Sequence, residues 1–243
     1  MANFFNVTLY QPLYNGLIFL MDVLPWADAG VAVILFTILI KLILFPLSKQ
    51  ATKTTLEMKV FEPEMNALKE KYKNNKDEQA RAVMAFYKEK GINPFSGLLI
   101  LIIQIPIVIA LYYVFYKGGL PVVKEELLYT FVSVPTINVF FLGLINVAQK
   151  SLFLAILAGV TQYFQLRFSV PIVKAVENPS LKDDLARSMS IQMRYIMPVL
   201  TFIVAYSVSG AVALYLTTSN VFTVCQELYI RRKLKIVPAP IAK

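Results

Sequence analysis

The sequence has 243 residues, a net charge of +9 and 57% hydrophobic residues, more than the roughly 45–50% of a soluble domain. It contains no histidine and a single cysteine, Cys225, which excludes a Ser–His dyad, a histidine-ligated metal and an internal disulfide. Glycine-rich phosphate loops are also missing from the sequence. We therefore expect no enzyme, no catalytic residue, no cofactor and no metal site.

Residues 1–28 predict a short amphipathic helix that lies in the outer membrane interface. Apolar residues recur through it, but Pro12 and Gly16 interrupt their spacing. Residues 1–6 contain no Lys or Arg, so the basic start of a usual signal peptide is missing. This pattern favours an interfacial helix over a membrane span.

Residues 29–47 predict the first span, because a run of about 18 or more apolar residues can cross a bilayer. Pro46 is expected to close it. Residues 48–93 are different, with ten Lys or Arg and with apolar residues at helical spacing. We expect a cytoplasmic helical hairpin there, with its turn near Asn74.

The second span is expected at residues 94–116, where Asn93-Pro94 provides a cap and a first-turn proline. Residues 117–150 predict an external loop with a partly apolar helix near residues 139–145. Residues 151–169 predict the third span, and residues 170–194 a polar cytoplasmic loop.

The apolar region that follows is too long for one straight crossing, and Ser207, Ser209 and Gly210 mark a break in it. We expect a fourth span at residues 195–208 and a fifth at 209–230, followed by a basic cytoplasmic tail at residues 231–243.

The distribution of basic residues predicts the orientation. Residues 48–93, 167–194 and 231–243 hold ten, five and five Lys or Arg, which is 20 of the 24. Five spans place these three segments on one side, which must be the cytoplasm. The N-terminus is then outside and the C-terminus cytoplasmic.

Lys41 lies within the first predicted span, where a charge costs roughly 2.5–3.5 kcal/mol at the helix centre. Its amine could reach the cytoplasmic surface, or it could occupy a water-filled interior. Helical side chains lean toward the helix N-terminus, here the outer side, which favours the interior. No Asp or Glu lies well inside a predicted span, so we expect an acidic group of a client to pair with Lys41.

Polar side chains also occur in the other predicted spans. Any one of them could simply bond its own helix or a neighbouring one, but together they predict a hydrated cavity. The residues expected to line it are Thr37, Lys41, Gln104, Gln162, Gln165 and Asn220.

Several motifs resemble segments of the YidC family of membrane protein insertases, in the same order. The second predicted span carries Asn93-Pro94-Phe95-Ser96-Gly97, Gln104-Ile105-Pro106 and Leu111-Tyr112-Tyr113. Further similar segments are Gln11-Pro12-Leu13, Phe45-Pro46-Leu47 and Ser219-Asn220 with Gln226. The resemblance covers residues 11–232 and therefore most of the chain.

The resemblance implies an all-α membrane protein whose five transmembrane helices surround a hydrophilic groove. The groove is open to the cytoplasm and to lipid but closed on the outside. Tyr215 and Leu216 join Thr37, Gln165 and Asn220 as residues similar to groove positions. Relatives usually carry an arginine where Lys41 stands, and lysine keeps the charge but lacks the planar fork.

The expected function is therefore that of a membrane protein insertase and chaperone in the bacterial inner (plasma) membrane. It would move short polar flanks of clients through the groove and release hydrophobic segments into lipid, without nucleotide hydrolysis. Its partners would be nascent membrane proteins and the lipid bilayer. A Sec-type translocon and the ribosome stay open as partners, and no specific nucleic acid is expected.

Two alternative functions could also account for these polar residues. A small-solute or ion transporter would need the inverted repeat and the acid–base relay that this sequence does not display. A non-catalytic assembly scaffold would tolerate apolar replacements of the groove residues.

Overall fold

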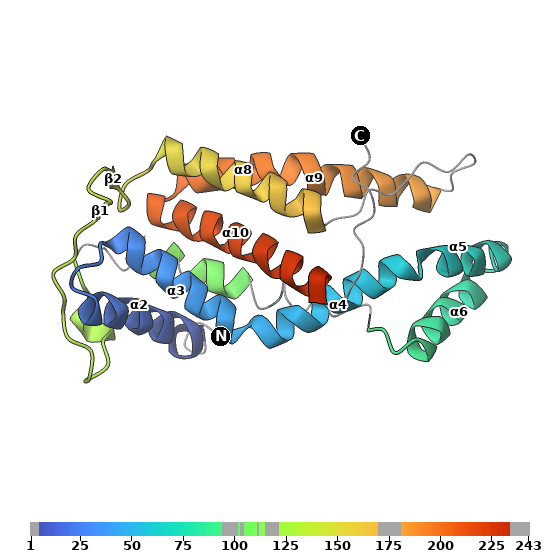
Figure 1. Ribbon diagram of the computed structural model, residues 1–243, viewed down its shortest axis with the longest axis horizontal. Coiled ribbons are helices and arrows are strands. Elements are labelled where there is room, and N and C mark those ends of the chain that lie inside the picture. The colour runs from blue at the N-terminus through green and yellow to red at the C-terminus, as the bar shows by residue number, and fades with distance from the viewer. Residues whose placement is uncertain are drawn as a thin grey trace. The chain divides into compact units, whose positions relative to one another are not determined.

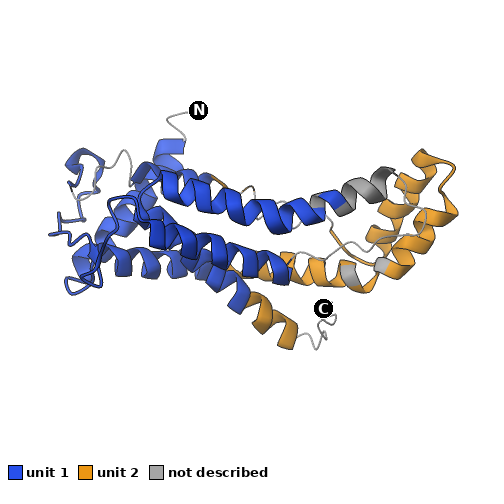
Figure 2. Ribbon diagram, turned by 90° about the horizontal axis from the view of Figure 1, so that it is seen from above, with its two compact units in different colours: residues 1–43, 106–225 blue, residues 44–105, 226–243 orange. Residues whose placement is uncertain are grey.

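The computed structural model describes residues 5–93, 102, 105–110, 112–114, 122–169 and 181–233. This part of the chain is mainly helical, as expected for an all-α protein (Figure 1). It divides into two compact units (Figure 2). Unit 1 comprises residues 1–43 and 106–225, and unit 2 comprises residues 44–105 and 226–243.

Unit 1 begins with the π-helix η1 (Asn6–Tyr10), which continues directly into α2 (Gln11–Val23). Pro12, which has no N–H to donate, lies where the π-helical turns of η1 give way to the α-helical turns of α2. A Cβ on Gly16 would lie 2.8 Å from the Phe36 ring of α3. Glycine at this position therefore allows α2 to pack closely against α3. A helix was predicted here, and its location in the membrane interface stays a prediction.

Helix α3 (Ala29–Ile43) starts at a side-chain cap. The Asp28 carboxylate accepts the Val31 N–H through Oδ1 at 2.9 Å, which satisfies one of the free donors of the first turn. Ala32, Val33 and Phe36 form its buried face, whereas Leu42 and Ile43 near its end are exposed. One face of the helix is therefore buried in the protein, and apolar residues near its C-terminal end are exposed.

The segment after the second predicted span contains η2 (Glu125–Leu127) and a short antiparallel pair of strands, β1 (Phe140–Phe141) and β2 (Ile145–Asn146). The prediction of a helix near residues 139–145 is wrong. Leu142 and Gly143 have φ angles of +51° and +71°, which reverse the chain and are incompatible with a right-handed helix. Aromatic and β-branched residues on both sides suit strands instead.

Three helices complete unit 1: α8 (Leu152–Ser169), α9 (Leu181–Ser207) and α10 (Gly210–Lys233). The last residues of α10, from Gln226 on, belong to unit 2. Helices α8 and α9 pack along each other. A Cβ on Gly159 of α8 would lie 3.1 Å from Phe202 and 3.2 Å from the Pro198 carbonyl, both on α9. The chain breaks between α9 and α10 at residues 208 and 209, where the sequence predicted a break. Helix α9 starts at Leu181, so the second half of the predicted loop 170–194 is helical.

Of the described helices, none has by itself both the length and the hydropathy that a membrane crossing requires. Helix α3 (Ala29–Ile43) and the segment Phe45–Met58, which meet at a bend of 65°, have them together. The number of spans and their predicted limits stay predictions.

Unit 2 contains α4 (Phe45–Val60), α5 (Glu62–Lys71) and α6 (Lys76–Glu89). Helices α5 and α6 pack against each other and are joined by a turn at residues 72–74, next to the predicted turn position. Asn75 caps α6, because its Oδ1 accepts the N–H groups of Asp77 and Glu78 at 3.2 and 3.3 Å. A helical hairpin therefore lies within residues 48–93.

The hairpin is held together mainly by contacts between its own residues. The Phe61 and Phe86 rings meet edge to face with centroids 6.1 Å apart. The Lys90 ammonium lies 4.7 Å from the Phe61 ring centre and 3.0 Å from the Glu64 carboxylate. Gln79 of α6 donates to the Lys69 carbonyl of α5 at 2.6 Å.

Candidate functional site

Lys41 lies in the last turn of α3, and its side chain reaches α10. Its Nζ donates to the Thr223 hydroxyl at 3.4 Å. Thr223 in turn donates to the Ser219 carbonyl of its own helix at 2.8 Å. The ammonium is partly buried, so the structure places a positive charge at the junction of α3 and α10.

Thr37 lies one turn before Lys41 and is fully buried. Its hydroxyl donates to the Val33 carbonyl of its own helix at 2.6 Å. Thr217 of α10 makes the same kind of bond, to the Ala213 carbonyl at 2.9 Å. These hydroxyls are therefore satisfied locally, as serine and threonine commonly are within helices.

Asn220 connects α10 with α8. Its side-chain amide donates toward the Ala158 carbonyl at 3.4 Å and the Thr161 hydroxyl at 3.3 Å. Asn220 and Thr223 are one turn apart on α10. One turn of α10 therefore bonds α8 and the next bonds Lys41 of α3, and the polar residues of three helices meet there.

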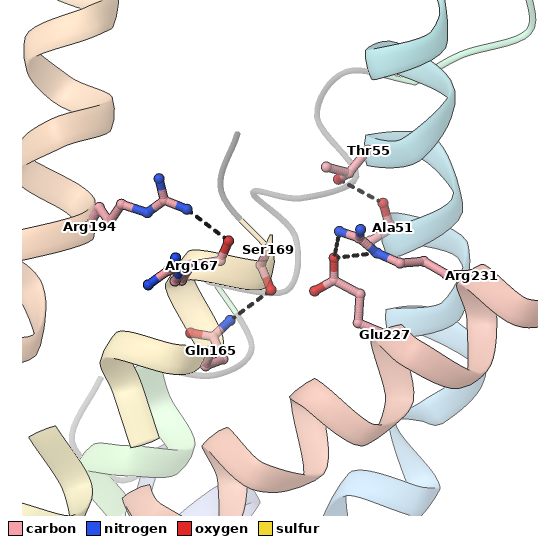
Figure 3. Close-up of polar contacts among 8 residues, drawn as sticks. All are labelled: Ala51, Thr55, Gln165, Arg167, Ser169, Arg194, Glu227 and Arg231. Atoms are coloured by element: carbon pink, nitrogen blue, oxygen red, sulfur yellow. Dashed lines mark hydrogen bonds and ion pairs between the residues drawn. The ribbon is translucent and has the colours of Figure 1, made fainter. Parts of the chain in front are cut away.

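Gln162 and Gln165 form a polar chain along α8. The Gln162 amide donates to Gln165 Oε1 at 3.0 Å. The Gln165 amide in turn donates to the Ser169 hydroxyl at 3.2 Å, as Figure 3 shows. Beside the end of this chain, the Arg194 guanidinium of α9 donates to the Arg167 carbonyl at 2.9 Å. Both glutamines are partly exposed, so they could exchange these bonds for bonds to water or a ligand.

The other predicted groove residues contribute in different ways. Tyr215 of α10 is fully buried and Leu216 is partly buried. Gln104 lies outside the described residues. The structure thus joins Lys41 to α10 and Asn220 to α8, while the exposure of all these residues to a common groove stays a prediction.

Three contacts were missed in the sequence. Thr223 follows Ser219 and Asn220 on one face of α10, and this spacing could have identified it. In unit 2, the Gln226 amide donates to the Ser48 hydroxyl of α4 at 2.7 Å. Close to it on the same helix, Arg231 donates through Nε to the buried Glu227 carboxylate at 3.1 Å (Figure 3). The spacing of four residues is typical of a helical ion pair.

Comparisons with known proteins agree over most of the chain. The family model described as 60Kd inner membrane protein matches residues 20–237. The membrane protein insertase YidC of Treponema denticola is 30% identical over 241 residues, which is 92% of this chain but 38% of that protein. The YidC protein of Anaeromyxobacter is also 30% identical, over 91% of this chain and 37% of its own length. The chain thus spans under two-fifths of these two relatives.

Shorter relatives are matched over most of their length. The membrane protein insertase YidC of Clostridium tetani is 31% identical over 86% of this chain and 84% of its own. The YidC protein of Fusobacterium nucleatum is 28% identical over 93% of this chain and 98% of its own.

Proposed function

Because the chain belongs to the 60Kd inner membrane protein family, the family of YidC, we propose that it is a membrane protein insertase of the bacterial inner membrane. The observation that carries this proposal is the match to the Clostridium tetani and Fusobacterium nucleatum insertases over 84% and 98% of their lengths. The region shared with these relatives is nearly all that they possess, which supports assigning their named activity to it.

We further propose five spans with the N-terminus outside and the C-terminus in the cytoplasm. The three basic segments support this orientation. Large apolar side chains are exposed along α8 and α9, including Phe153, Ile156, Phe164, Val199 and Ile203. Such surfaces are unfavourable in water but suit contact with lipid chains.

The proposed groove is lined by Lys41 and the polar residues of α8 and α10. Lys41 brings a positive charge to this lining and donates to the Thr223 hydroxyl. An acidic client flank would be attracted to that charge. Side-chain amides such as that of Gln165 would replace part of the water lost by the flank and lower its desolvation cost.

The energy for insertion would come from the client and from the membrane potential. Burial of the client segment in lipid contributes roughly 0.8 kcal/mol per CH₂. A negative-inside potential favours outward movement of an acidic flank by about 2.3 kcal/mol per charge per 100 mV. No nucleotide hydrolysis is required in this scheme.

The hairpin in residues 48–93 is proposed to receive clients, because it is charged, exposed and folded through its own contacts. Nascent membrane proteins are the proposed clients, and the same surface is where we would look for a ribosome or a Sec-type translocon. A chaperone role would follow if clients are retained in the groove while they fold.

The test is insertion of a single-span client into liposomes that contain the purified chain, followed by protease protection. Two clients are compared, one with Asp residues in its translocated flank and one with Asn at the same positions. Lys41→Ala should reduce insertion of the acidic client about tenfold, which corresponds to about 1.4 kcal/mol. The neutral client should change little, and Lys41→Arg should retain most of the activity.

Lys150→Ala is the matched control, because Lys150 is an exposed lysine just before α8. Equal losses for both clients, or equal losses in the Lys41 and Lys150 variants, would contradict the role of the Lys41 charge. Failure of the unmodified chain to insert either client would contradict the insertase activity itself.

A further inference from the structure

The loop that contains β1 and β2 ends in an apolar tip. Leu142 and Leu144 are 66% and 83% exposed, although leucine is usually buried. Residues 130–149 contain no Asp, Glu, Lys or Arg. An uncharged loop with two leucines at its tip is unusual for a connection that faces water.

The tip is held in place by hydrogen bonds and packing. Leu142 has a positive φ angle that branched residues rarely adopt, and its N–H donates to Asp28 Oδ2 at 2.9 Å. The same carboxylate caps α3 through its other oxygen. Phe141 packs directly over Gly30, where a Cβ would lie 2.3 Å from its ring. The two leucines are therefore held outward on a fixed turn.

The loop is also bonded to the start of another helix. The Gly210 N–H donates to the Gln149 carbonyl at 2.7 Å, and the Ala211 N–H donates to the Val147 carbonyl at 2.9 Å. The tip therefore lies at the end of unit 1 where α3 and α10 begin, as Figure 1 shows. In a membrane protein, helix ends of this kind lie near the boundary between lipid chains and headgroups.

Trp26 belongs to the same end of unit 1. It lies two residues before Asp28 and is 73% exposed. Tryptophan is enriched at membrane interfaces, because its ring is apolar and its N–H is polar. Leu152 and Phe153, in the first turn of α8, are likewise apolar and exposed. Trp26 and the tip thus expose apolar side chains, as do the helix surfaces proposed to contact lipid.

We propose that Trp26 and the Leu142–Leu144 turn form an interfacial anchor that inserts into the lipid leaflet at which α3 and α10 begin. Lipid is the occupant that fits best, because residues 130–149 carry no charge for a polar partner and α8, which follows in the chain, also exposes apolar side chains. The anchor depends on residence in the membrane but not on insertase activity, so it can be tested independently of client insertion.

The first test uses Trp26, which is the only tryptophan in the sequence. The full chain is reconstituted in liposomes with lipids brominated either near the headgroup or near the chain end. The shallow bromines should quench Trp26 at least about twofold more than the deep ones, and aqueous iodide should quench it weakly. Strong iodide quenching without an effect of either bromolipid would overturn the proposal for Trp26.

The second test examines the turn itself. Leu144→Cys in a Cys225→Ser background provides one labelling site for a polarity-sensitive fluorophore. The matched control is Asn74→Cys in the same background, because Asn74 is exposed in the charged hairpin turn. The label at position 144 should report an apolar environment that iodide does not reach, whereas the label at position 74 should report water.

Dilution with lipid separates a lipid anchor from a protein contact. An apolar signal at position 144 that persists as the protein-to-lipid ratio falls supports the anchor. A signal that becomes aqueous on dilution indicates a second copy of the chain and would overturn the proposal, as would identical aqueous signals at both positions.

Discussion

The hairpin in residues 48–93 and the loop in residues 117–150 both connect consecutive predicted spans, but they are stabilised differently. The hairpin is charged and closes on itself through Phe61, Phe86 and the Lys90–Glu64 ion pair. The described part of the loop, residues 122–150, has little regular structure and is bonded to α2, α3 and α10.

The difference shows two ways to order a long connection. Helices of the hairpin satisfy their own backbone groups, so few bonds to other parts of the chain are needed. The loop cannot do this and relies on Asn15, Asp28 and the start of α10 as partners. A change in the loop should therefore affect the body of unit 1, whereas a change in the hairpin should stay local.

The strongest way to challenge this comparison is Asn15→Leu. Asn15 is buried, donates to the Leu127 carbonyl at 2.8 Å and accepts the Tyr129 N–H at 2.6 Å. Leucine would leave the Tyr129 N–H without this partner, at a cost of about 1–3 kcal/mol. The Leu127 carbonyl would keep only its bond from the Gln11 amide at 3.2 Å. The melting temperature in detergent should fall, and hydrogen exchange in residues 122–131 should accelerate.

The amides of α5 and α6 serve as the internal reference in that experiment. Their exchange should not change in Asn15→Leu. Unchanged exchange in the loop, or equal acceleration in the hairpin, would contradict the separation between the two regions.

A pair of glycine substitutions sharpens the comparison. Gly30→Ala places a methyl group against the Phe141 ring, and such overpacking typically costs about 1–3 kcal/mol. Gly91→Ala meets no neighbour within 4 Å, and its φ of +66° makes the cost purely conformational, about 1 kcal/mol. Hydrogen exchange should accelerate around β1 and the start of α3 in the first variant.

In Gly91→Ala the faster exchange should be confined to the end of α6. If Gly30→Ala instead leaves β1 as well protected as before, the close packing of Phe141 on α3 does not hold the loop.

The smallest effect is expected for Lys90→Met. Loss of the Lys90 ammonium removes a partly exposed ion pair with Glu64 and the contact with the Phe61 ring. Together these contribute roughly 0.5–1 kcal/mol. Exchange in α5 and α6 should rise slightly, and part of the difference should vanish at high salt. Lys73→Met is the control, because its ion pair with Glu70 is fully exposed and should matter less. An equal effect of both variants would show that Lys90 does not hold the hairpin closed.

Much of the fold could be predicted because local signals determine it. Asn74 and Asn75 mark the hairpin turn, and Ser207, Ser209 and Gly210 mark the end of α9. The strands β1 and β2 could not be predicted in this way, since Phe140, Phe141 and Ile145 fit a helix as well as a strand. The turn at Leu142 is decided by Asp28, which lies 114 residues away in the sequence.

The candidate site was predicted as a set of residues but not as a set of contacts. Charge within an apolar run identified Lys41, yet its partner Thr223 is 182 residues away. Only the tertiary structure brings these two side chains together. Asn220 was selected for a groove, and the structure shows that its amide also joins α10 to α8.

The exposed turn at residues 72–74 has a practical consequence for imaging. At 27.5 kDa the protein is small for single-particle microscopy, where alignment requires a recognisable mass outside the micelle. The hydrogen bonds of the turn are made to its immediate neighbours, such as Lys73 to Glu70 and Asn75 to Tyr72. If the hairpin lies in the cytoplasm as proposed, a compact marker domain fused at Asn74 would be carried by two packed helices and would provide that mass.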